Sequence, residues 1–325
     1  MPPLRPNSPD QFSIFDIPGC EPLAAAKRPP KPMQKEYVAK DGQKFVPVPG
    51  YESLVMGEDG LVTRIVHTHS KKKARKVGFY AHVVSKGMTF KWGGRLWWIE
   101  FHSGPGQLFE IETCEVLPGS PLGALTVPSP FAGYIFVEFD ALCADSLRKR
   151  TAAFRNVTVI EGDANSPEVL DKIRATVPTS ALAVFYADPE DLDDFDFETI
   201  KFITARYAHP DWLINFPTSG VVRYLTSGGD DQRAVSLLDM ERPAELVAVK
   251  EGRTWGPQVS TYFRRRLEAL GYTCRYEPIH LDSNNVPIYD LFIATKDTTG
   301  RALDFFDKAC GIRADGQRQL FEIAS

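Results

Sequence analysis

Continuous apolar runs alternate with helical stretches through the middle of the chain, and this alternation limits the fold more than any other feature. The runs are apolar at every position rather than at every second one, which is typical of strands buried on both faces of a sheet. Strand, helix and strand in succession produce parallel pairs, because parallel strands need a crossover connection. The predicted strands are 96–101, 134–139, 157–160, 182–186 and 212–216, and the predicted helices between them are 141–154, 167–177 and 197–207.

The last part of the chain changes this pattern. An amphipathic helix at 260–271 is followed by two predicted strands, 272–280 and 288–295, which are joined by the turn-rich residues 282–285. Two strands without a helix between them form an antiparallel hairpin. We therefore predict an α/β fold, a doubly wound and mostly parallel seven-stranded sheet of the Rossmann-like methyltransferase type that ends in an antiparallel hairpin. NAD-binding folds usually finish with a parallel strand instead.

The length of 325 residues allows one large domain with an extension. Residues 1–50 are rich in proline and polar residues, so we expect a disordered or extended segment there. Residues 51–90 contain a turn and a helical pattern at 70–87 and are predicted to form a helical lead-in. Residues 91–325 are predicted to form the Rossmann-type domain.

Composition argues against several classes of protein. The chain has no apolar run of about 18 residues, which a membrane span would need. No apolar segment follows the first residues, so the sequence predicts no secretory signal and a cytoplasmic location. The five cysteines are dispersed without a CxxC pair, which indicates reduced thiols rather than disulfides or a zinc site.

The formal charge of −4 conceals an uneven distribution. Residues 1–90 contain 14 Lys and Arg against 8 Asp and Glu, whereas the remainder contains 24 against 34. Much of the basic excess lies in one run that is able to contact phosphates, although a solvated helix face is the commoner role of such a run. The residues of this candidate nucleic-acid contact are Lys71, Lys72, Lys73, Arg75 and Lys76.

The first predicted strand leads into a glycine-containing turn. Glu100 and His102 precede Gly104 and Gly106, and glycines let the backbone approach a ligand closely. The dinucleotide pattern GxGxxG fails, because Phe109 stands where the third glycine would be. A pyrophosphate site is therefore disfavoured, while a cofactor without a diphosphate fits.

Acidic residues follow the next strands at the same edge of the predicted sheet, where open α/β sheets bind ligands. Glu138 ends the second strand and is placed to accept hydrogen bonds from both hydroxyls of a ribose. Asp163 and Ala164 follow the third strand, where a carboxylate is able to accept an adenine amino group. Glu138 lies far beyond the glycines, so the segment 107–130 is predicted to be a long loop or insertion.

The fourth strand ends at Asp188 and Pro189. Enzymes that methylate amines use an (Asp/Asn/Ser)-Pro-Pro-aromatic turn to hold the target, and here only the Asp-Pro pair is present because Glu190 follows. Asp188 is a candidate to orient a substrate amine or to face the methyl sulfonium. A turn that merely starts a helix is an equally good interpretation of this pair.

Taken in order, these motifs resemble a known family. They are similar to the three-Cys-motif partner protein (TcmP) family, over roughly residues 57–310. The matching segments are Ile99–Gly106, Gly119–Leu125, Phe136–Asp140, Gly162–Asn165, Ala187–Pro189 and Leu213–Pro217 with Arg223. The sequence departs from the family at Glu100, where Asp is preferred, and at His102 and Ser103, where Phe and Ala are usual.

The resemblance implies a methyltransferase-like fold and S-adenosylmethionine as the cofactor. It also implies a partner, a three-Cys-motif protein that resembles radical enzymes and is often encoded beside the family in bacteria and phages. The leading hypothesis is an S-adenosylmethionine-dependent methyltransferase that acts on a nucleic acid or a nucleotide. The alternative is a methyltransferase-fold subunit that binds without transferring methyl groups, and an NAD-dependent oxidoreductase is disfavoured by the missing glycine.

Overall fold

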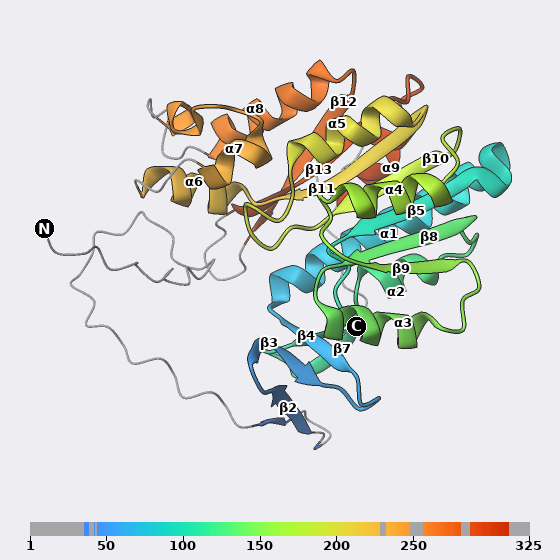
Figure 1. Ribbon diagram of the computed structural model, residues 1–325, viewed down its shortest axis with the longest axis vertical. Helices are drawn as coiled ribbons and strands as arrows, with labels where there is room; N and C mark the ends of the chain where they lie inside the picture. Colours follow the sequence, from blue (N-terminus) through green and yellow to red (C-terminus); the bar gives the residue numbers. More distant parts are fainter. Residues whose placement is uncertain are drawn as a thin grey trace, which may run out of the picture.

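The computed structural model describes residues 36–38, 42, 44–227, 232–247, 256–280 and 287–311. The larger of its two β-sheets has seven strands in the order β12-β13-β11-β10-β5-β8-β9 (Figure 1). The strands of this Rossmann sheet are β5 (Leu96–Phe101), β8 (Gly133–Glu138), β9 (Val157–Glu161), β10 (Leu182–Ala187), β11 (His209–Phe216), β12 (Thr273–His280) and β13 (Pro287–Thr295).

The directions of these strands confirm the predicted fold. Strand β10 is parallel to both β5 and β11, and β5 and β9 are parallel to β8. Strand β13 is antiparallel to β11 and β12, which makes the final hairpin. The turn predicted at 282–285 lies outside the described residues. The chain thus has the α/β, seven-stranded sheet of the Rossmann-like methyltransferase type.

Two hydrophobic cores lie on opposite faces of the Rossmann sheet. In the central strand β10, Ala183 and Phe185 belong to one core, while Val184 and Tyr186 belong to the other. This alternation of two apolar sets explains why the strand is apolar at every position.

Helices cover both faces of the Rossmann sheet. One core is completed by α4 (Pro167–Thr176), α5 (Phe197–Arg206), α6 (Thr218–Thr226), α7 (Gln232–Leu238) and α8 (Gly256–Ala269). The other is completed by α1 (Thr68–Trp92), α2 (Ser120–Leu125) and α9 (Arg301–Cys310), with Leu147 of α3 (Ala141–Thr151) at its edge. Two short 3-10 helices are Gly93–Arg95 and Pro243–Val247.

A second, smaller sheet packs beside α3 at one end of the Rossmann sheet (Figure 1). Its six strands are β1 (Tyr37–Val38), β2 (Lys44–Val48), β3 (Tyr51–Met56), β4 (Val62–Val66), β6 (Gln107–Glu110) and β7 (Glu115–Pro118). Strand β4 pairs with β6 in parallel, so the chain before α1 and the chain after β5 share one sheet.

In two regions the structure differs from the prediction, because both contribute strands to the small sheet. The segment 107–130, expected as a long loop or insertion, contains two strands and helix α2. Strands 44–48, 51–56 and 62–66 precede the helix of the predicted lead-in, which begins at Thr68. Residues 1–35 lie outside the described residues, and the domain boundaries at 50 and 90 remain predictions.

Arg150 on α3 joins the small sheet to the Rossmann sheet. Its side chain is only 5% exposed, and its Nη1 donates to the carbonyls of Val62 and Pro105, each at 2.7 Å. Its Nε donates to Asp59 Oδ2 at 2.8 Å. One guanidinium therefore binds the β3–β4 turn, strand β4 and the turn that follows β5.

Candidate functional site

A cavity of about 570 Å³ opens where β8 and β9 end, between the Rossmann sheet and the small sheet. It lies at the edge where parallel α/β sheets bind ligands. Seven carboxylates line it. Arg64 and Arg233 are the only Lys or Arg side chains that line it among the described residues. The seven acids are Glu138, Asp140, Asp163, Glu190, Asp191, Asp193 and Asp194. The electrostatics favour a small ligand that carries positive charge.

Glu138 is the acid that most directly shapes this cavity. Its Oε2 accepts a hydrogen bond from Gly104 N at 2.6 Å, and its Oε1 accepts one from Asp140 N at 2.9 Å. Burial raises the pKa of Glu138, although these hydrogen bonds and nearby Arg64 oppose the shift. Each oxygen retains acceptor capacity. The last residue of β8 thus fixes the glycine turn and remains in the wall of the cavity.

The turn after β5 has an unusual backbone. His102, Gly104 and Gly106 all have positive φ angles, of 59°, 62° and 88°. The two glycines adopt this conformation freely, while His102 is strained there. A methyl group on Gly106 would lie 3.0 Å from Leu147 Cδ1, so this position is also too close to α3 for a larger residue.

His102 is the clearest unsatisfied group in the site. Its Nε2 donates to Asp194 O at 3.0 Å, and its ring edge meets Phe195 with centroids 5.9 Å apart. Its Nδ1 is buried and has no partner in the described part of the chain. Since a buried acceptor normally has a partner, Nδ1 is suited to a ligand donor in the cavity.

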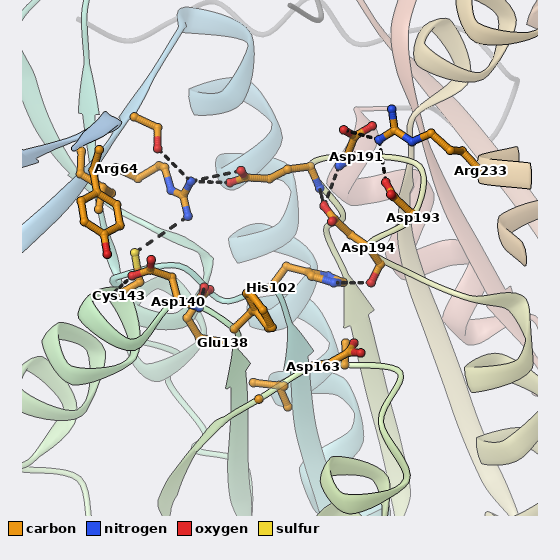
Figure 2. Close-up of a pocket in the computed structure, with 18 residues that line it drawn as sticks. Arg64, His102, Glu138, Asp140, Cys143, Asp163, Asp191, Asp193, Asp194 and Arg233 are labelled. Atoms are coloured by element: carbon orange, nitrogen blue, oxygen red, sulfur yellow. Dashed lines mark hydrogen bonds and ion pairs between the residues drawn. The ribbon is translucent and has the colours of Figure 1, made fainter. Parts of the chain in front are cut away.

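Asp163 and Ala164 line the same cavity as Glu138. Asp163 Oδ1 accepts a hydrogen bond from Asn165 N at 2.8 Å, and Asn165 Nδ2 donates to Asp194 O at 3.0 Å. Figure 2 shows Glu138, Asp163 and His102 arranged around one space, with Asp194 above them. Asn165 therefore connects the acidic turn after β9 to the loop after β10.

A second cavity, of about 330 Å³, adjoins the first. Both cavities are lined by Ser53, Arg64, His102 and Glu190. The predicted site residues are consequently divided between them. Glu138, Asp163 and Ala164 line the first; Gly104, Gly106, Asp188 and Pro189 line the second; His102 lines both.

Asp188 is held by two donors in the second cavity. Lys73 Nζ lies 2.6 Å from Asp188 Oδ1, and Asn215 Nδ2 donates to the same oxygen at 2.8 Å. Burial alone would lower the pKa of Lys73, but the Asp188 carboxylate outweighs it and raises that pKa. Lys73 also lies over the Tyr289 ring, 5.4 Å from its centroid. Because both donors use Oδ1, Oδ2 is able to accept a further hydrogen bond.

Glu100 does not line either cavity. It is fully buried in β5, where Trp98 Nε1 donates to it at 3.1 Å and Ser120 Oγ donates at 2.5 Å. Burial raises its pKa to about 8, against the effect of these hydrogen bonds. Glu100 thus ties strand β5 to α2 beneath the glycine turn.

An ion pair that bridges the two cavities was not predicted from the sequence. Arg64 Nη1 of β4 lies 2.8 Å and 3.1 Å from the two carboxylate oxygens of Glu190, which follows β10 (Figure 2). Arg64 Nη2 lies 3.9 Å from Cys143 Sγ. No motif in the strand-end segments points to Arg64, because the small sheet brings it to the site.

The structure disperses the basic run of α1. Lys71 Nζ forms ion pairs with Glu110 and Glu115, both at 2.9 Å, and Lys73 points into the second cavity. Lys76 Nζ donates to Cys310 O at 3.2 Å. Lys72 and Arg75 are exposed. The five predicted nucleic-acid contacts therefore do not form one continuous surface.

The described residues contain no group of three or more His, Cys, Asp and Glu that is placed to hold a metal ion. In the same residues, no helix has the length and apolarity to cross a membrane.

Comparisons with known proteins give loose structural matches. No protein-family model and no curated protein matches the sequence. An O-methyltransferase from Bacillus cereus, in complex with SAH, is 10% identical, with a TM-score of 0.42, over 68% of this chain and 80% of its own. A spermidine synthase from Thermotoga maritima is 9% identical, with a TM-score of 0.41, over 84% and 74%. Protein LPL1258 from Legionella pneumophila is 13% identical, with a TM-score of 0.47, over 71% and 88%. At these identities and scores the matches assign neither activity nor ligand.

Proposed function

We propose that the chain is an S-adenosylmethionine-dependent methyltransferase. The observation that carries this proposal is the convergence of Glu138, Asp163 and the His102 turn on one acidic cavity. Glu138 would accept hydrogen bonds from the ribose hydroxyls, and Asp163 with Ala164 would bind the adenine. Gly104 and Gly106 line the adjoining second cavity, so the amino-acid part of the cofactor would extend to the border of the two cavities, where these glycines let the backbone pass close to it.

The cavity suits this cofactor in charge. Its excess of carboxylates favours a ligand with a sulfonium and an amino group, and it opposes the diphosphate of a dinucleotide. The unpartnered Nδ1 of His102 supplies an acceptor for a ligand hydroxyl or amine. Bound there, the cofactor would supply an electrophilic methyl group.

The second cavity would hold the methyl acceptor. Lys73 and Asn215 fix Asp188, so its Oδ2 would accept a hydrogen bond from an acceptor amine and orient the nitrogen lone pair. Tyr289 and His69 form an aromatic wall, with ring centroids 6.1 Å apart. A planar heterocycle with an amino group suits this wall, which supports a nucleic-acid or nucleotide substrate.

Calorimetric titration with S-adenosylmethionine or S-adenosylhomocysteine tests the cofactor site. Glu138→Ala and Asp163→Ala should each weaken binding, because each removes a carboxylate from the cavity. Glu161→Ala is the matched control, since Glu161 ends the neighbouring strand and pairs with Arg148 outside the cavity. Absence of binding heat at millimolar cofactor would exclude the proposed activity.

A second candidate is a methyltransferase-fold subunit that binds the cofactor without turnover. Glu190 follows Pro189 where amine methylating enzymes have a second proline, and it is engaged by Arg64. Tritiated methyl transfer to DNA, RNA and a three-Cys-motif partner protein separates the two candidates. Transfer to any of them supports the enzyme, and cofactor binding without transfer supports the subunit. The partner protein, the bacterial or phage origin and the cytoplasmic location remain part of this proposal.

A further inference from the structure

A third cavity, of about 320 Å³, forms a groove between α1, α2 and the small sheet. Gly78 and Gly123 let the two helices approach, since a methyl group on Gly123 would lie 3.8 Å from Gly78 Cα. A methyl group on Gly78 would meet nothing within 4 Å, so this glycine faces open space in the groove. The two glycines therefore leave part of the groove wall without side chains.

The groove adjoins the cavity proposed for the methyl acceptor. Ala74, Leu108 and Gly119 line both spaces. A ligand that lies in the groove would have to extend one group past only these three residues to approach Asp188. The acceptor is consequently not limited to a molecule that fits within 330 Å³.

The charge of α1 favours an anionic ligand. The helix contains seven Lys and Arg residues and no Asp or Glu. Among the described residues, no acidic side chain lines the groove. Lys71 is neutralised by Glu110 and Glu115, but Arg75 is exposed and makes no ion pair in the described part of the chain. Arg75 is therefore the cation at the groove that is placed to contact a phosphate.

Exposed aromatic residues and cations share one face of α1. Residues spaced by three, four or seven positions share one face of a helix. The exposed residues with this spacing are Lys72, Arg75, Phe79, Lys86 and Phe90. Phe79 is 45% exposed and stacks on His82, with ring centroids 6.0 Å apart and planes 12° apart. This stripe of cations and rings is about 27 Å long at the rise of an α-helix.

We propose that this face of α1 and its groove bind a single-stranded nucleic acid whose target base enters the cavity beside Asp188. Phosphates would contact Arg75, and bases would stack on Phe79 and on Phe90. A single strand is favoured over a duplex because a base must leave its stack to reach the second cavity. The inference rests on the proposed methyltransferase function, whose substrate class it specifies.

The test is fluorescence anisotropy of the full chain with a short labelled single-stranded DNA or RNA, without cofactor. Arg75→Glu should weaken binding by about tenfold and reduce the slope of log affinity against log salt by about one. Phe79→Ala should weaken it by roughly five- to tenfold with little change in that slope. Arg174→Glu, on the opposite face of the Rossmann sheet, makes the same change in charge and should have no effect.

Gly78 provides a second pair of variants that leaves the charge unchanged. Gly78→Leu should place a side chain in the groove and weaken oligonucleotide binding, whereas Gly78→Ala should bind as the wild type does. Both variants should fold, because Gly78 has ordinary helical geometry and open space beside it. Thermal unfolding of both variants would check this.

Several results would overturn the proposal. Equal effects of Arg75→Glu and Arg174→Glu would mean that only overall charge matters. If duplex DNA or polyglutamate binds as tightly as the single-stranded oligonucleotide, or more tightly, the ligand of this face is not a single-stranded nucleic acid. If cofactor binding fails while oligonucleotide binding depends on Arg75, the proposed transferase activity is excluded and the groove remains. If the cofactor binds and Arg75 has no effect, the groove is excluded and the cofactor site remains.

Discussion

The cavity at the ends of β8 and β9 and the groove along α1 carry opposite charges. Seven carboxylates line the cavity against two arginines, whereas no acidic side chain among the described residues lines the groove. The cavity would therefore repel the phosphates that the groove attracts. Under the proposed function, the two regions would bind different components of one reaction, and neither would substitute for the other. Four predictions test this separation, from the largest expected effect to the smallest.

The first prediction concerns Glu100, which links β5 to α2 between the two regions. Its pKa of about 8 in the folded chain lies above the ordinary value of 4.5, so the folded state binds the proton more tightly. The resulting stability is present below pH 4.5 and is lost as the pH rises through 8. Glu100→Gln should therefore be more stable than wild type at pH 9, by an amount on the order of a few kcal/mol, and the two proteins should be similar near pH 4, with the difference growing between pH 4.5 and 8.

Urea unfolding at a series of pH values measures this difference. Asp211, whose pKa burial raises to about 7, titrates in the same range but is present in both proteins, so its effect cancels. Parallel pH profiles for the variant and the wild type would contradict the prediction.

The second prediction tests whether the two regions act independently. Glu138→Gln should weaken cofactor binding by about 100-fold through lost charge-assisted hydrogen bonds, and it should leave oligonucleotide binding unchanged. Arg75→Glu should weaken oligonucleotide binding and leave cofactor binding unchanged. Calorimetry measures cofactor binding and anisotropy measures oligonucleotide binding. Both measurements on the two single variants and the double variant complete a double-mutant cycle. Effects that are not additive would show that the regions are coupled.

The third prediction uses two neighbours in the sequence that lie in different regions. Lys73 is bonded to Asp188 in the second cavity, while Lys72 is exposed on the stripe of α1. Lys73→Met should lower methyl transfer by about tenfold, because Asp188 loses one of two donors, and should not change the salt slope of oligonucleotide binding. Lys72→Met should lower that slope by about one and leave transfer at saturating oligonucleotide unchanged. Identical behaviour of the two variants would count against the separation.

The smallest effect is expected at the bridge of Arg64 and Glu190. Glu190 is 63% exposed, so the ion pair contributes little, about 0–1 kcal/mol. Glu190→Gln should raise the cofactor dissociation rate by roughly threefold, because the wall shared by the two cavities is loosened. Stopped-flow fluorescence measures this rate, and Glu198→Gln, on α5, is the control. A slower cofactor dissociation from Glu190→Gln than from the wild type would contradict the prediction that the ion pair of Arg64 and Glu190 helps to retain the cofactor.

The parts of the fold that follow from local pattern were predictable from the sequence. Each strand of the Rossmann sheet was located within a few residues, because strands covered on both faces are apolar throughout. The final hairpin was predicted because no helical segment separates 273–280 from 287–295. The small sheet was not predicted. Its strands β4 and β6 are separated by α1 and β5, and such non-local pairing leaves no periodic signal.

The same distinction applies to the candidate site. Glu138, Asp163 and Asp188 follow strands whose ends meet at one edge, so their position near one another follows from topology. Glu100 also belongs to such a strand, but its side chain points to Trp98 and Ser120 instead. Arg64 and Lys73 reach the site from the small sheet and from α1, and only the tertiary structure brings them there.

The guanidinium of Arg150 has a consequence for how the molecule unfolds. It binds Asp59 and Val62 of the small sheet and the Pro105 carbonyl in the glycine turn. Opening the small sheet would leave this buried cation without its partners, which costs far more than an exposed contact. The small sheet and the turn should consequently open in one cooperative step and show the same protection of their amides against hydrogen exchange.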